Sequence, residues 1–186
     1  KEMLVRGLAR RALVLAPASL VTQWQDEMEA KFDLAFRIAE RPEDWSGRLV
    51  VASIDAAKGA RHQAALVKIQ HELVIVDEAH NLKNHRTQNW KLVNALRKKY
   101  LLLLSATPIQ NDLIELYNMI TLLRPGQLYT LGQFKEAFLD PKDKRKCKDP
   151  ARLKELLRAV MVRNRRTEVG IEFVARRAVR AEVDLG

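Results

Sequence analysis

The sequence predicts an α/β protein built on a mostly parallel sheet, and three observations support this fold class. Short apolar runs at residues 12–16, 49–53, 72–76 and 100–104 alternate with stretches whose apolar residues recur at helical spacing. These runs are apolar at almost every position, as strands buried on both faces are. As a third observation, the runs end in polar residues or proline, and a parallel topology would bring these residues to one edge of the sheet.

The run at residues 72–76 ends abruptly in two adjacent carboxylates, Asp77 and Glu78. Ligands of open parallel sheets bind beyond the carboxyl ends of the strands, so both side chains are expected at the ligand edge. Because neighbouring residues of a strand point to opposite sides, one carboxylate could hold Mg²⁺ and the other a water. By itself, the motif is equally compatible with a strand that runs into an acidic loop.

The stretch after the first apolar run predicts a strand-turn-helix unit. Pro17 closes the strand, and Ser19 is expected to cap the helix. Apolar residues at positions i, i+4 and i+8 mark the core stripe of this helix: Leu20, Trp24 and Met28. The amides around Ala18 and Ser19 could hold a phosphate oxygen, and an ordinary capped helix is the alternative.

Two further strands are expected to end at the same edge. The run at residues 49–53 ends in Ser53, and a weaker strand is expected near Leu34. The run at residues 100–104 has the composition of a buried strand and ends at Ser105, whose hydroxyl would lie near the carboxylates.

The second half of the chain contains clear helix signals. Asp112 is expected to cap a helix, with Glu115 at the capping-box position and Pro125 at its end. Asp149 and Pro150 form a favourable N-cap and first-turn pair for a later helix, which is expected to dock on the domain.

These patterns divide the chain into three parts. Residues 1–128 are expected to form the sheet-based lobe, residues 129–166 a helical extension packed on it, and residues 167–186 a linker toward a further lobe. A basic run at residues 141–148 is either a solvated loop or a contact for nucleic acid.

The composition favours a nucleic-acid partner and argues against a metal-rich or disulfide-bonded protein. Lysine and arginine (33) exceed aspartate and glutamate (23), which gives a net charge of +10. Cys147 is the only cysteine, and no apolar run is long enough to cross a bilayer, so we expect a reducing, intracellular compartment. The four histidines lack metal-ligand spacing, since Ile75 stands where a zinc-protease helix that begins at His71 needs its second histidine.

Several motifs occur in a fixed order along almost the whole chain: Pro17-x-x-Leu20-x-x-Gln23-Trp24-x-x-Glu27, Asp77-Glu78-Ala79-His80-x-Leu82-Lys83-Asn84, Ser105-Ala106-Thr107-Pro108-x-Gln110-Asn111 and Arg163-Asn164-Arg165-Arg166. Together they resemble the Swi/Snf-type ATPases of helicase superfamily 2, with a DEAH box and, in the Arg-Asn-Arg-Arg form, bacterial members. The resemblance implies a three-layer, RecA-like P-loop NTPase lobe from an ATP-driven, double-stranded DNA translocase.

The resemblance also implies roles for single residues. Asp77 would hold Mg²⁺ through water, Glu78 would activate the attacking water, and His80 would complete the catalytic set. The residues implied to couple nucleotide state to lobe movement are His80, Ser105, Thr107, Gln110 and Asn111. Those implied to follow the DNA backbone are Pro17, Ala18, Ser19 and Ser53.

One departure from the family pattern is large. No Gly-x-x-x-x-Gly-Lys-Ser/Thr phosphate loop occurs in the 186 residues. We therefore expect a truncated first lobe that lacks the phosphate-loop strand, with ATP and Mg²⁺ used by the intact parent and neither bound tightly by the fragment. Loss of that strand would leave residues 101–104 at an open sheet edge, available to pair with a second copy or to be covered by residues 1–11 or the tail.

Two other readings remain open. A non-catalytic domain for nucleic-acid or protein binding would also explain the missing loop and the positive charge. A DEAH-type RNA helicase is disfavoured by Gln23-Trp24 and by Gln110-Asn111. The expected partners are double-stranded DNA and a DNA-bound protein complex such as RNA polymerase, without membrane contact, in the bacterial cytoplasm at the nucleoid.

Overall fold

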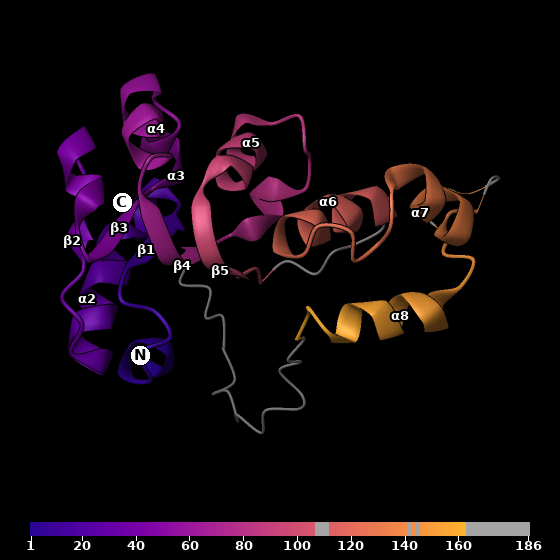
Figure 1. The fold of residues 1–186 in the computed structure, drawn as a ribbon, viewed down its shortest axis with the longest axis horizontal. Coiled ribbons are helices and arrows are strands. Elements are labelled where there is room, and N and C mark those ends of the chain that lie inside the picture. Colours follow the sequence, from indigo (N-terminus) through magenta and orange to yellow (C-terminus); the bar gives the residue numbers. More distant parts are fainter. Residues whose placement is uncertain (107–111, 141–142, 144–145, 163–186) are drawn as a thin grey trace, which may run out of the picture.

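The computed structural model describes residues 1–106, 112–140, 143 and 146–162, and its centre is a five-stranded parallel sheet (Figure 1). The strands lie in the order β2-β3-β1-β4-β5 across the sheet, and every neighbouring pair is parallel. Their bounds are β1 Ala12–Ala16, β2 Arg37–Ile38, β3 Leu49–Ser53, β4 Gln70–Val76 and β5 Arg97–Leu103. The predicted α/β class and mostly parallel sheet are confirmed.

Helices cover both faces of this sheet. Their bounds, with the short 3₁₀ turns, are α1 Glu2–Val5, η1 Ala18–Leu20, α2 Val21–Phe32, η2 Pro42–Ser46, α3 Ile54–Ala57, α4 Ala60–Leu66, η3 Ala79–Leu82 and α5 Gln88–Ala95. Along β1, Leu13 and Leu15 face a core shared with α3 to α5, whereas Val14 faces a second core shared with α1 and α2. This alternation explains why the central strands are apolar at every position.

The parallel register brings the polar strand ends to one edge, as the sequence predicts. Ala16 of β1 pairs with Ser53 of β3, and Leu15 pairs with Val76 of β4. Beyond the ladder of β5, the amide of Leu104 donates to the Val76 carbonyl at 2.9 Å. Residues that follow these strands therefore leave the sheet on the same side.

β5 is the outermost strand of the sheet within the described residues. The sequence suggested a buried strand, but burial along β5 alternates, and Leu102 is 43% exposed. Full burial was wrong, because a strand that pairs on one side only keeps part of its surface open, whereas the predicted edge position of residues 101–104 is confirmed within the described residues. Pairing of a second copy along this edge stays a prediction.

Two local predictions need correction. The strand expected near Leu34 lies three residues later, where β2 is only two residues long, and Leu34 itself packs on the apolar core. Ser19 does not cap α2, because it lies inside the 3₁₀ turn η1, and Leu20 takes the N-cap position. Short edge strands and tight turns carry little periodicity, which is why sequence patterns misplace them.

Three helices form a separate apolar cluster beside the β5 side of the sheet (Figure 1): α6 Leu113–Leu123, α7 Leu131–Phe138 and α8 Pro150–Arg158. Phe134 and Phe138 of α7 are fully buried at its centre, against α6 and α8. Asp149 accepts a hydrogen bond from the Arg152 amide at 3.0 Å and so caps α8 as predicted. Within the described parts of the chain, none of the helices is long and apolar enough to span a membrane.

Candidate active site

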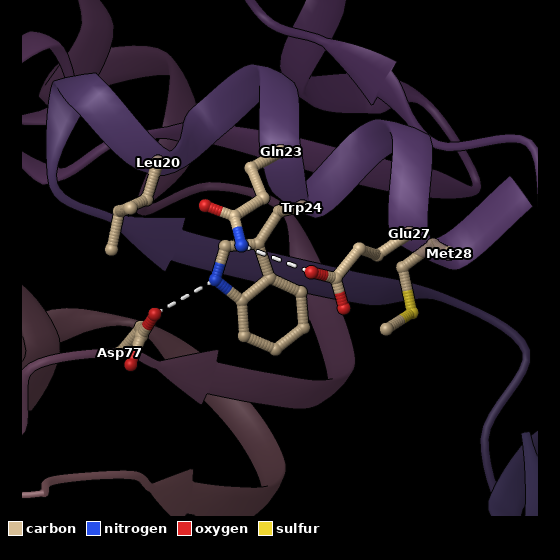
Figure 2. A pocket seen from close by; sticks show the side chains of 6 residues that line it. All are labelled: Leu20, Gln23, Trp24, Glu27, Met28 and Asp77. Carbon is tan, nitrogen blue, oxygen red and sulfur yellow. Dashed lines mark hydrogen bonds between the residues drawn. The ribbon is translucent and has the colours of Figure 1, made fainter. Parts of the chain in front are cut away.

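The carboxylate of Asp77 is held in a fixed orientation at the end of β4. Its Oδ2 accepts a hydrogen bond from the indole Nε1 of Trp24 at 2.8 Å (Figure 2). Its Oδ1 accepts one from the Glu78 amide at 2.8 Å. The Asp77 amide itself donates to the Leu15 carbonyl at 2.8 Å and so continues the pairing with β1. These hydrogen bonds fix the orientation of the carboxylate, and each oxygen keeps a further lone pair for a ligand.

Glu78 turns the chain sharply away from the sheet. It adopts a left-handed conformation, with φ of 47° and ψ of 47°, which costs a residue with a side chain about 1 kcal/mol or more. The turn separates the Glu78 side chain from that of Asp77 and leads directly into η3. Strain of this kind persists only where the surrounding structure fixes it, and it is frequent at active sites.

His80 lies close to Glu78, as the second residue of η3. Its Nδ1 is 3.0 Å from Oε2 of Glu78, although the angles are not those of a hydrogen bond. The two side chains therefore lie in contact at the carboxyl edge of the sheet. The approach becomes an ion pair when the imidazole is protonated.

A pocket of about 240 Å³ opens between α2 and Asp77 (Figure 2). Its lining residues are Leu20, Gln23, Trp24, Glu27, Met28 and Asp77. Gln23 donates to Glu27 at 2.9 Å, and this hydrogen bond, followed by the neighbouring Lys31, lowers the pKa of Glu27. The stripe Leu20, Trp24 and Met28, which was predicted to lie in the core, therefore lines a partly open pocket. The hydrogen bond between Trp24 and Asp77 lies on one side of this pocket.

The residues expected along a DNA backbone lie next to each other at the same edge. Pro17, Ala18 and Ser19 follow β1 directly, and Ser53 ends the neighbouring strand in register with the end of β1. Ala18 and Ser19 are exposed. The Ser53 hydroxyl accepts hydrogen bonds from the amides of Asp55 at 3.1 Å and Ala56 at 3.4 Å and thereby caps α3.

The residues expected to couple nucleotide state to movement can be located only in part. Ser105 follows β5 at the same edge as Asp77, in agreement with the prediction. Thr107, Gln110 and Asn111 lie outside the described residues, as does the basic segment at 163–166.

Sequence reasoning missed the contacts that α6 makes with the loop after Glu78. The prediction of a capping box at Glu115 was wrong, because Asp112 caps α6 alone, through the Ile114 amide at 2.7 Å. Glu115 instead forms an ion pair with Lys83 at 3.0 Å. Asn118, in the next turn, donates to the Lys83 carbonyl at 2.9 Å.

The donor set suits a metal that arrives with phosphate rather than a metal held by protein alone. Among the described residues, no group of three or more His, Cys, Asp and Glu could hold a metal ion. Asp77 offers one oriented carboxylate whose oxygens still have unused lone pairs. Mg²⁺ commonly binds through one or two carboxylates together with water and substrate phosphates, so Asp77 fits such an ion when a nucleotide is present.

Residues 3–185 match the SNF2-related domain, and the chain therefore belongs to this family. Its fold agrees with the SWI2/SNF2 ATPase core of Sulfolobus solfataricus, solved in complex with double-stranded DNA. The TM-score is 0.75 at 24% identity, over 88% of this chain and 35% of that one. The α/β lobe built around Asp77 is thus a RecA-like lobe of the SNF2 type.

Among curated relatives, the chain is 43% identical over 177 residues to the "Uncharacterized ATP-dependent helicase YqhH" of Bacillus subtilis. That match covers 95% of this chain and 31% of the relative. The DNA repair and recombination protein RAD54-like of Gallus gallus is 32% identical over 179 residues, covering 81% of this chain and 24% of that protein. The chain thus spans about a third or less of the length of these relatives.

Proposed function

We propose that this chain is part of the first motor lobe of an ATP-driven translocase that acts on double-stranded DNA. The observation that carries the proposal is the pair Asp77 and Glu78 at the carboxyl edge of a parallel sheet, with Asp77 oriented by two hydrogen bonds. Two comparisons support it: the Bacillus relative is named an ATP-dependent helicase, and the Sulfolobus ATPase core was solved on duplex DNA.

In this proposal Asp77 is the residue that would hold Mg²⁺, through water. Such an ion, bound together with ATP, would supply neutralisation of charge on the phosphates. Hydrogen bonds from the Trp24 indole and the Glu78 amide fix the orientation of the Asp77 carboxylate. The carboxylate therefore does not have to reorient when a ligand binds at this edge. Trp24 is thereby a positioning residue, since it acts through Asp77.

Glu78 orients and deprotonates the water that attacks the terminal phosphate. Phosphoryl transfer depends on positioning and charge more than on covalent chemistry, so the turn at Glu78 would contribute by fixing where its carboxylate lies. The Nδ1 of His80 is 3.0 Å from the Glu78 carboxylate. In this proposal His80 couples the nucleotide state to the segment that begins at Ser105. Thr107, Gln110 and Asn111 belong to the same proposed relay.

DNA contact is proposed along Pro17, Ala18, Ser19 and Ser53, which lie side by side on the same edge. These positions offer backbone amides and hydroxyls, which suit phosphates and do not distinguish bases. The net charge of +10 adds an electrostatic attraction that is independent of sequence. The finer proposal is action at the bacterial nucleoid, together with a DNA-bound protein complex such as RNA polymerase.

A second candidate is a binding domain without catalysis. It is favoured by one observation, that no glycine-rich phosphate loop occurs in the 186 residues. A DNA-stimulated ATPase assay on the full-length protein that carries this chain separates the two. We expect hydrolysis that requires Mg²⁺ and rises on duplex DNA. DNA binding without any hydrolysis would refute the motor proposal and favour the second candidate.

A further inference from the structure

The loop between Glu78 and Lys83 is hydrogen-bonded at both of its ends to neighbouring elements. At its start, the Ala79 amide donates to the carbonyl of Leu104, just after β5, at 2.8 Å. At its end, the Lys83 carbonyl accepts a hydrogen bond from the side chain of Asn118 on α6 at 2.9 Å. The loop that carries Glu78 and His80 therefore has one anchor on the sheet and one on a helix.

Asn118 is an unusual residue for its place in α6. It is only 6% exposed, and its neighbours on the helix, Met119 and Ile120, are apolar and buried. A buried amide without partners is costly, so an apolar residue would be the simpler choice for this position. The hydrogen bond to Lys83 offsets that cost and ties the amide to the loop.

A second contact fixes Asn118 itself. Its backbone carbonyl accepts a hydrogen bond from the indole Nε1 of Trp90 on α5 at 2.9 Å. α5 packs on the main sheet core through Leu92 and Val93, so this bond ties α6 to a helix that is buried against the sheet. The ion pair between Lys83 and Glu115, at 3.0 Å, joins the same loop and helix at the surface, where both side chains are partly exposed.

From these contacts we infer that Asn118 is a positioning residue, which holds the Glu78–Lys83 loop against α6 and so fixes the place of Glu78. The Lys83–Glu115 ion pair supports the same contact from the surface. The two anchors, Leu104 and Asn118, lie on either side of residues 105–112 in the chain. Movement between β5 and α6 would therefore act directly on this loop. The catalytic part of the inference rests on the proposed function.

The anchor can be tested without any catalytic activity, by amide hydrogen exchange of residues 1–186. Asn118→Leu keeps the branched shape and the number of heavy atoms and removes the donor, and we expect exchange in the segment 78–83 to rise about tenfold. Thr121→Val is the matched control, because Thr121 donates within α6 to the Tyr117 carbonyl at 2.8 Å, away from the loop. Unchanged exchange of this loop in Asn118→Leu, with α6 still protected, would overturn the anchor.

The full-length protein tests whether the anchor positions Glu78. Displacing a catalytic group by about 1 Å can cost about 100-fold in rate, so Asn118→Leu should lower kcat between about 10- and 100-fold while KM for ATP stays within about twofold. Lys83→Glu and Glu115→Lys should each lower kcat, and the double exchange should restore it.

The outcomes separate the anchor from the proposed function. Faster exchange with an unchanged kcat in an active enzyme would overturn the positioning role, because the contact would then be structural only. A parallel rise in KM would also contradict it. If the full-length wild-type protein hydrolyses no ATP, the proposed function fails, and the exchange result alone still decides whether Asn118 anchors the loop.

Discussion

His71 gives a stability prediction that can be worked directly from the structure. Its side chain on β4 is fully buried, and both ring nitrogens lack a hydrogen-bond partner in the described part of the chain. Burial, and to a lesser extent the positive charge of Arg11, lowers the pKa of His71 from 6.5 to about 4. Below pH 6.5 the unfolded chain therefore binds a proton that the folded protein does not.

The sign and size of the effect follow from this difference. The two pKa values differ by about 2.5, and each unit corresponds to about 1.36 kcal/mol, so acid can lower the free energy of unfolding by at most about 3 kcal/mol. The contribution of His71 is fully present above pH 6.5 and falls as the pH approaches about 4. At pH 5 the free energy of unfolding should be about 2 kcal/mol lower than above pH 6.5 because of His71.

Urea unfolding of residues 1–186 at about pH 7, 6 and 5 measures this loss. His71→Leu is the reference, because leucine is apolar and cannot bind a proton, whereas all other titrating groups are retained. We expect the wild type to lose about 2 kcal/mol more than His71→Leu between pH 7 and 5. Parallel pH profiles for the two proteins would refute the reasoning.

Three further predictions concern the site. Trp24→Phe removes the indole donor to Asp77 and should lower the free energy of unfolding by about 1 to 2 kcal/mol in urea titrations; an unchanged stability would mean that the hydrogen bond contributes little. DNA binding by residues 1–186 should weaken steeply with salt, by about 0.9 in the log–log slope for each phosphate contact, and a flat salt titration or a strong preference for one sequence would contradict phosphate tracking. Residues 1–186 alone should neither bind ATP tightly nor hydrolyse it, because they contain no glycine-rich loop to hold the phosphates; measurable DNA-stimulated turnover by this chain would count against that expectation.

The central strands could be predicted because burial on both faces leaves a continuous apolar signal. β1 and β3 occupy the predicted residues, and the carboxylates after β4 appear at the predicted edge. The strand β2 could not be located, since two residues carry no period. The leucines of β5 resemble those of a strand buried on both faces, so its partial exposure was not predicted from composition. Its edge position among the described residues was predicted from the missing phosphate-loop strand.

The candidate site could be predicted only where its chemistry is local in sequence. Asp77, Glu78 and His80 lie together in one motif, so their proximity could be predicted without knowledge of the fold. The Trp24–Asp77 hydrogen bond joins residues 53 positions apart, and the Asn118–Lys83 bond joins residues 35 apart. Helical periodicity assigned Trp24 to the core and gave no role to Asn118, because a pattern along one helix carries no information on its partners.

The account depends most on Glu78 as the residue that activates water. In the full-length protein, Glu78→Gln keeps the size and hydrogen-bonding capacity of the side chain and removes its carboxylate. ATP turnover on duplex DNA, measured together with nucleotide affinity, tests this assignment most directly. We predict nucleotide binding within about twofold of the wild type and hydrolysis reduced by at least about 100-fold. A Glu78→Gln variant that hydrolyses ATP on DNA at near the wild-type rate would contradict the account.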